Sequence, residues 1–313
     1  MIRLDAATVL LQWSVGGLVF LWVTTRHRLV GLGYGWLLRG VFGVLAAGAI
    51  VASRFTERVP VREVASAGVA LATAVALGVS IVRRRSGVRG QRVEADRKRA
   101  RVAAMSTSAA ATSATSTAGG EPATASIEMR DQFGRASGAA AAPSGGEGPE
   151  FPPVLDLIAP LIGLVGLVAA GWVAGGNRWL AVARTLVGAV FLGAVSDAML
   201  LGHWYLVQPG LPRKHLNDLV RALGWVWPVE IIALLLPIGM VSVWSGSVSD
   251  GWGGQLGWFW AACAITTLVL VVVTKAALRE RYYSAVMAAT GLLYLAILTA
   301  FGTDLVARAI LAG

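Results

Sequence analysis

Eight long apolar segments alternate with short polar loops along the chain. They cover residues 6–24, 32–53, 62–82, 153–175, 179–207, 218–243, 255–277 and 282–311. Each has roughly the 20 residues that a helix needs to cross the hydrocarbon core of a bilayer. The outward-apolar, inward-polar alternation of a β-barrel is absent, so helices must satisfy the backbone polar groups. The sequence therefore predicts an all-α integral membrane protein, a bundle of about eight transmembrane helices.

One long polar stretch interrupts this pattern after the third apolar segment. Residues 105–148 are mostly Ala, Ser, Thr and Gly, with almost no large apolar side chain. Such a composition cannot bury enough surface to offset chain entropy, so we expect residues 84–150 to form a disordered linker. The linker divides the chain into a first membrane part, residues 1–83 with three helices, and a second, residues 151–313 with five.

The distribution of basic residues predicts the orientation in the membrane. Residues 83–101 carry nine Lys or Arg against two acidic residues. Cytoplasmic loops of membrane proteins are enriched in Lys and Arg, so this stretch, and with it the linker, should be cytoplasmic. The other loops that then fall on the same side are 25–31, 208–217 and 278–281, each with two or more basic residues. On the opposite side, loop 244–254 has none and the loop before 179 has Arg178, whereas loop 54–61 departs from the pattern with Arg54 and Arg58, partly balanced by Glu57. Both chain ends are expected outside.

The same basic stretch indicates a partner. A cluster of Lys and Arg beside a membrane helix attracts anionic lipid head groups, so we expect residues 83–101 to contact them. No aromatic residue or known fold motif accompanies the cluster, so binding to nucleic acid is not expected.

Composition narrows the class of protein further. Charged residues make up 14% of the chain, against about 25% in soluble globular domains, so an ordinary soluble enzyme is excluded. The only cysteine is Cys263, which rules out an intrachain disulfide and a cysteine-based metal site. The abundance of Ala, Gly and Val, with three lysines, is typical of a GC-rich bacterial genome. We therefore expect a multi-pass protein of a bacterial cytoplasmic (inner) membrane.

Three charged residues lie inside apolar segments, where each needs an explanation. Asp197 and Glu230 should lie at a similar depth, and Arg39 should lie close to that level, at about 12–15 Å from the cytoplasmic side. Together they would form a buried Arg–carboxylate cluster, either a proton relay or ligand site or a salt bridge that fixes helix register. Asp156 and Asp304 lie near segment ends, where a side chain can reach the interface.

A second group of candidates lies in the string 196–215. Asp197 and Trp204 are two helical turns apart and share one face. His203, Trp204 and Tyr205 should lie near the cytoplasmic interface, where they could contact a ligand. The three histidines of the chain all fall near that boundary and are weak candidates for binding a metal, haem or quinone: His27, His203 and His215.

Two prolines bear on the site around Glu230. Pro228 and Pro237 should loosen the sixth segment, and carbonyl groups freed there can line a cavity.

Three functions remain open. The first is a membrane subunit or anchor of a redox system, one of several proteins in a complex, contacting quinone or haem near the cytoplasmic side. The second is a proton-coupled carrier of a small solute that uses Asp197 and Glu230. The third is a scaffold or assembly factor. No nucleotide-binding or catalytic-triad pattern is present, so catalytic activity of its own is not expected.

Overall fold

The computed structural model describes most of the chain outside the expected linker. The described residues are 5–86, 151–208, 211–237, 239–248, 250–280 and 282–311, with four isolated positions between 100 and 105. The predicted disorder of residues 84–150 and most of the basic stretch 83–101 therefore lie outside the described residues.

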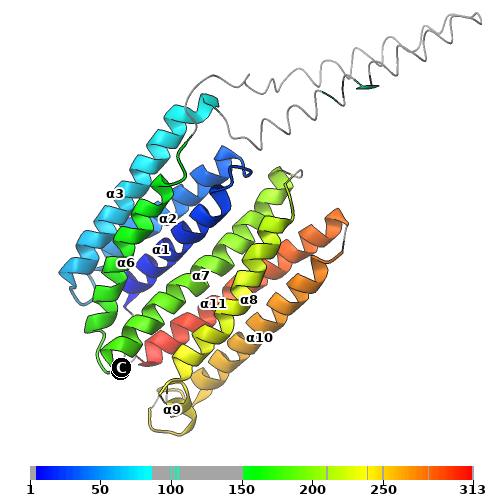
Figure 1. The fold of residues 1–313 in the computed structure, drawn as a ribbon. Helices are drawn as coiled ribbons and strands as arrows, with labels where there is room; N and C mark the ends of the chain where they lie inside the picture. Colours follow the sequence, from blue (N-terminus) through cyan, green and yellow to red (C-terminus); the bar gives the residue numbers. More distant parts are fainter. Residues whose placement is uncertain are drawn as a thin grey trace, which may run out of the picture.

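Every regular element in the described part is helical, which confirms the all-α prediction (Figure 1). The helices are α1 (Ala6–Thr25), α2 (Leu32–Ala52), α3 (Pro60–Val82), the short 3-10 helix η1 (Arg83–Ser86), α6 (Leu155–Val173), α7 (Arg178–Val207), α8 (Lys214–Leu235), α9 (Val241–Trp244), α10 (Gln255–Ala277) and α11 (Tyr283–Leu311). Seven of those described are long and apolar enough to cross a membrane: α1, α2, α3, α6, α7, α10 and α11.

The sixth predicted segment differs most from the structure. Instead of one helix over 218–243, α8 begins at Lys214 and ends at Leu235, and a single turn, α9, follows. Leu236 is extended (φ −81°, ψ 149°), as expected for a residue that precedes a proline. Pro228 is accommodated inside α8, so only Pro237 coincides with a break.

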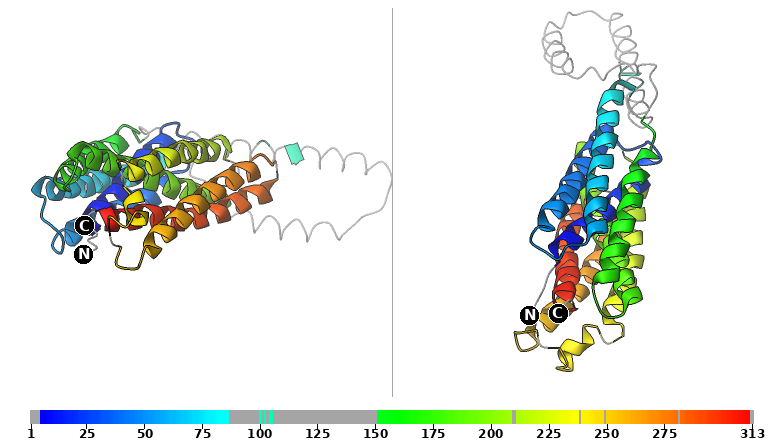
Figure 2. Two further views of the ribbon diagram at one scale, coloured as in Figure 1. Left: turned by 90° about the horizontal axis from the view of Figure 1, so that it is seen from below. Right: turned by 90° about the vertical axis from the view of Figure 1, so that its left-hand side faces the viewer.

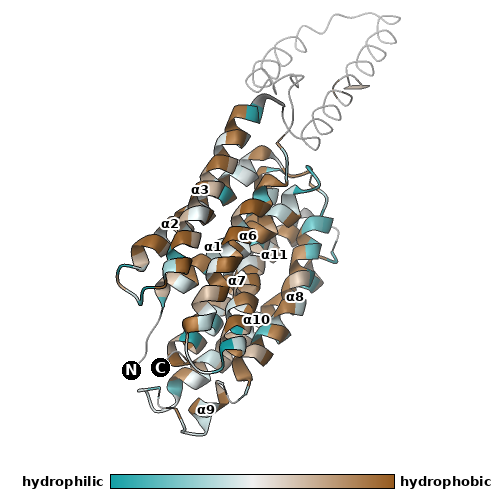
Figure 3. Ribbon diagram, turned by 60° about the vertical axis from the view of Figure 1, so that its left-hand side comes forward, coloured by the Kyte–Doolittle hydropathy of each residue, from teal (hydrophilic) through white to brown (hydrophobic). Residues whose placement is uncertain are grey.

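The helices form an antiparallel bundle with α1 and α7 in the middle (Figures 1 and 2). In the most apolar 18-residue stretch of each helix, 67% of the residues of α1 and 72% of those of α7 are buried, against 33% for α2, α3, α10 and α11. Each outer helix therefore keeps a large face uncovered by protein. Brown, apolar residues dominate the helices in Figure 3, and the polar residues gather mainly at their ends.

Two glycines allow the central helices to touch backbone to backbone. A Cβ added at Gly193 of α7 would lie 2.2 Å from the carbonyl carbon of Gly16 in α1, and one added at Gly16 would lie 1.8 Å from the backbone oxygen of Ala189. Because small residues let membrane helices approach closely, this contact sets the α1–α7 spacing.

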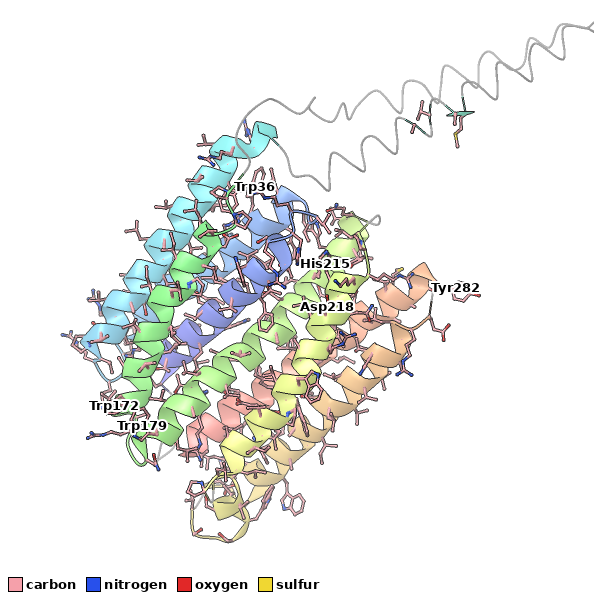
Figure 4. The ribbon with its side chains drawn as sticks, in the orientation of Figure 1. Trp36, Trp172, Trp179, His215, Asp218 and Tyr282 are labelled. Carbon is pink, nitrogen blue, oxygen red and sulfur yellow. The ribbon has the colours of Figure 1, made fainter. Side chains whose placement is uncertain are left out.

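The bundle has two distinct ends. We call the end that carries η1, the start of α6 and the α7–α8 connection the linker end. Both chain ends lie at the opposite end, here called the terminal end (Figure 2). Trp36, His215 and Tyr282 mark the linker end, and Trp172 and Trp179 mark the terminal end (Figure 4).

A capped loop closes the terminal end between α9 and α10. Both carboxylate oxygens of Asp250 accept backbone hydrogen bonds of 2.9 Å, donated by Gly254, Trp252 and Leu256. These N–H groups, that of Gly254 foremost, lower the pKa of Asp250. The loop is therefore held by a carboxylate that must stay ionised.

Candidate functional site

The structure separates the three charged residues that the sequence grouped. Asp197 lies ten residues from the linker-end terminus of α7, about 15 Å along the helix. Glu230 lies sixteen residues from the linker-end start of α8, about 24 Å along it. The expected depth match was wrong because α8 begins at Lys214 and ends at Leu235, which moves Glu230 toward the terminal end.

Arg39 pairs with a different carboxylate. Its Nε and Nη2 donate to the two oxygens of Asp156 at 2.8 and 2.7 Å, and the side chains are 3% and 1% exposed. Nη1 donates to Ser80 at 3.4 Å, and the guanidinium lies 4.3 Å from the ring centre of Phe151. Asp156 is therefore buried in an ion pair and does not reach the interface as expected.

Asp197 is isolated in the apolar centre of the bundle. Its side chain is fully buried, and neither carboxylate oxygen has a hydrogen-bond partner among the described residues. Trp204, two turns after Asp197 on the same face of α7, packs at a tilted angle against Tyr34, a fully buried residue of α2, with ring centres 5.9 Å apart.

The other residues of the 196–215 string play local roles at the linker end. The Trp204 indole N–H donates to the side chain of Gln208 at 3.2 Å. The Tyr205 hydroxyl donates to the carbonyl of Pro212, which fixes the turn into α8. His203 is exposed and has its ring centre 6.3 Å from that of Tyr294.

The histidines do not converge on one site. His27 and His215 have ring centres 6.0 Å apart at the linker end, while His203 contacts Tyr294 elsewhere. Within the described residues no three His, Cys, Asp or Glu side chains are grouped to hold a metal ion.

A charged cluster that the sequence did not predict surrounds Glu230 near the terminal end. Asp304 of α11 is fully buried and accepts two hydrogen bonds, of 2.9 and 2.8 Å, from Nε of Arg308, one turn later. Arg184 of α7 lies at the level of Glu230, because it donates to the carbonyl of Ala233, three residues after Glu230 in α8. Asp304 is thus part of the protein interior, and the expectation that it reaches the interface was wrong.

Glu230 is the unusual member of this cluster. It is fully buried, and neither of its carboxylate oxygens has a hydrogen-bond partner among the described residues. Asp304, in contrast, is held by Arg308. Burying an ionised carboxylate without a partner is costly, so Glu230 is the carboxyl group of the cluster whose burial needs an explanation.

A cavity of about 490 Å³ adjoins the cluster at the terminal end. Arg184, Thr185 and Arg308 line one side of it, and Asp5 and Glu57 line the other. Leu234, one helical turn after Glu230 in α8, is also part of the wall. Glu230 therefore lies one helical turn from the wall of a cavity whose lining includes four charged residues, Asp5, Glu57, Arg184 and Arg308.

The arginines are held in place by backbone carbonyl groups. Arg184 donates from Nε to Ala233 at 2.9 Å and from Nη2 to Leu236, which caps the end of α8. Nη2 of Arg308 donates to the carbonyl of Arg184 at 3.0 Å. The cluster thus joins α7, α8 and α11 at one level.

Glycine makes room for this arrangement in α7. A Cβ at Gly188 would lie 2.4 Å from Arg308, 2.7 Å from Asp304 and 3.0 Å from Gln12. Gln12 donates to the Thr185 carbonyl at 2.7 Å, and its own side-chain oxygen has no partner among the described residues.

Comparisons with known proteins add no family assignment. The chain matches no protein-family model, no curated protein and no solved structure.

Proposed function

We propose that the protein is a proton-coupled carrier of a small polar solute, with the terminal-end cavity as its solute site and Glu230 as its proton-binding group. The observation that carries the proposal is the Glu230 carboxyl group. It is fully buried, its oxygens have no partner among the described residues, and it lies one helical turn from Leu234 in the wall of a cavity that charged residues help to line. Intramembrane ionisable groups that face a cavity are typical of proton pathways.

Arg308 provides a physical link between solute and proton. It holds Asp304 through Nε and also lines the cavity. A solute that draws Arg308 toward the cavity moves positive charge away from the level of Glu230, so that Glu230 binds its proton more strongly. Solute binding and proton binding are then coupled through one side chain.

The proposal includes α8 as an eighth membrane span. Its 22 residues give about 33 Å of helix, enough for a hydrocarbon core of about 30 Å. Trp225, Val229 and Ile232 are 73%, 50% and 56% exposed on its outer face, whereas Glu230 points into the bundle. Apart from the buried Glu230, the charged residues of α8 are Lys214, Asp218 and Arg221, all near the linker end, so the rest of its outer face is uncharged.

Eight spans place both chain ends on one side of the membrane, in keeping with their common position in the bundle (Figure 2). We propose that the linker end is cytoplasmic, because the basic residues of loops 25–31 and 208–217 lie there and loop 244–254, at the other end, has none. The cavity then opens to the outside of a bacterial inner membrane.

The test is solute-driven proton movement in vesicles that contain the purified protein and an internal pH dye. Solutes are screened by chemical class, and the active one is then compared between the wild type and Glu230→Gln. Glutamine is isosteric and cannot release a proton, so we expect the variant to fold and to lose solute-linked acidification. Glu280→Gln, an exposed site at the linker end, is the matched control.

Two results would reject the proposal. One is coupled acidification that survives Glu230→Gln, and the other is a correctly folded wild type that moves no proton with any solute class. The second result would favour a scaffold. The redox hypothesis stays a separate prediction, and a reduced-minus-oxidised absorption spectrum with a Soret band would support it.

A further inference from the structure

The charges around the cavity are divided between its two sides. Arg184 and Arg308, from α7 and α11, are basic, whereas Asp5 and Glu57, from the start of α1 and the α2–α3 loop, are acidic. A cavity for a simple anion or cation would carry one sign of charge. Here the two signs face the same space of about 490 Å³.

One charge on each side is already neutralised within the protein. Asp5 is paired with Arg62, and Arg308 is paired with Asp304. Arg184 and Glu57, in contrast, make no ion pair with any residue that the structure describes. One cation and one anion around the cavity are therefore left without a partner of opposite charge.

The basic side also has hydrogen-bond donors that make no bond to the described residues. Arg184 and Arg308 each use Nε and Nη2 in bonds to the protein. The Nη1 group of each makes no hydrogen bond with the described residues. The two side chains are held near each other, because Arg308 donates to the Arg184 carbonyl. Guanidinium donors placed this way suit an oxyanion such as a carboxylate or phosphate.

The acidic side is held rigidly by Arg62. This residue is 1% exposed and joins the start of α1 to the α2–α3 loop, donating to Thr8 at 3.0 Å and to the Glu57 carbonyl at 2.8 Å. The backbone of Glu57 is thus fixed while its side chain remains exposed at the cavity. A carboxylate in this position can receive an ammonium group.

We infer that the cavity binds a small zwitterion, with its acid group on Arg184 and Arg308 and its ammonium group on Glu57. The inference rests on the proposed function for its role as transported solute, while binding itself does not depend on transport. Two kinds of molecule carry such a pair of charges: a free amino-acid-like solute, and the head group of an ethanolamine lipid at the membrane surface.

The experiment measures equilibrium binding of ω-amino acids, from glycine to 6-aminohexanoate, to the purified full-length protein by titration calorimetry. The series varies the distance between the two charges. Butyrate and butylammonium are controls for 4-aminobutyrate, since each keeps only one of its charges. We expect the best ω-amino acid to bind about tenfold more tightly than a single-charge analogue of equal length, the gain from one further charged hydrogen bond.

A variant on the exposed side of the cavity assigns the ammonium subsite. Glu57→Gln should bring the affinity for the best ω-amino acid down to that of its carboxylate-only analogue and leave the analogue unaffected. Glu280→Gln should change neither value. Equal affinity of butyrate and 4-aminobutyrate, an unchanged preference in Glu57→Gln, or no binding by any member of the series would overturn the inference.

A second arm separates the two sources. The binding measurement is repeated in nanodiscs of phosphatidylglycerol with and without phosphatidylethanolamine. A head-group site predicts that the ethanolamine lipid suppresses binding of the soluble probe, and a free-solute site predicts no effect. Zwitterion binding without proton movement would support this inference and reject the carrier. Proton movement driven by a monovalent anion alone would support the carrier and reject the zwitterion site.

Discussion

Breaking the buried ion pair between Arg39 and Asp156 should destabilise the bundle strongly. The pair has two charge-assisted hydrogen bonds of 2.8 and 2.7 Å, and its side chains are 3% and 1% exposed. Asp156→Ala leaves the guanidinium buried with Ser80 and the face of Phe151 as its remaining contacts. An uncompensated buried charge of this kind costs about 3–5 kcal/mol.

The assay is denaturant unfolding of the purified protein in mild detergent, followed by tryptophan fluorescence. Asp218→Ala is the matched control, because its pair with Arg221 is 3.8 Å long and its side chain is 44% exposed, so it should lose at most about 1 kcal/mol.

A double variant separates the pair's attraction from the burial of charge. Arg39→Met with Asp156→Leu removes both charges, so we expect it to be nearly as stable as the wild type. A loss below about 1 kcal/mol in Asp156→Ala, the value of a surface pair, would refute the reasoning. So would a double variant that is no more stable than the single one.

Two further predictions concern packing and pH. Gly193→Ala should lower the free energy of unfolding by about 1–3 kcal/mol, because the added methyl group meets the α1 backbone. Gly40→Ala is the control and should not lower it, because nothing lies within 4 Å of the added group. Equal effects of the two variants in the same unfolding assay would contradict the proposed α1–α7 contact. Backbone N–H groups, foremost that of Gly254, lower the pKa of Asp250 in the folded protein. The loop is therefore fully stabilised above the pKa of an unfolded aspartate, about 3.9. It loses this stabilisation as the pH falls through the lower pKa of the folded state. Protease sensitivity of the α9–α10 loop should rise over that range in the wild type, and a pH-independent loop would contradict the prediction.

The helical bundle could be predicted because each long apolar segment carries its own signal. The end of α8 could not be predicted in this way, because the sequence stays apolar through Pro237 and Met240. Hydropathy alone does not indicate where the backbone leaves the helix. The restriction that Pro237 places on Leu236 decides that position.

The candidate site was predicted in part for a related reason. Glu230 stands out as a charge within an apolar run, but its partners depend on which helices are neighbours, and the sequence does not show this. A signal for Asp304 and Arg308 was present in their spacing of four residues, one turn apart. Because successive helices alternate in direction, they also lie at the same end of the bundle as Arg184, which is close to the start of the segment 179–207. Comparing depths across all segments, including their ends, would have placed these three together.

Asp197 lies between Glu230 and the linker end of the bundle. In the proposed carrier, a proton taken up at Glu230 from the terminal-end cavity must cross this packed half of the bundle to reach the linker end. In that half, among the residues that the structure describes, Asp156 is neutralised by Arg39 and Asp197 is buried without a partner. Asp197→Asn should therefore stop solute-driven acidification of vesicles while leaving equilibrium binding of the solute unchanged. Glu230→Gln, in contrast, should also remove the pH dependence of binding. If Asp197→Asn still transfers protons at the wild-type rate, Asp197 lies off the pathway, and the proton must leave by the same cavity through which it came.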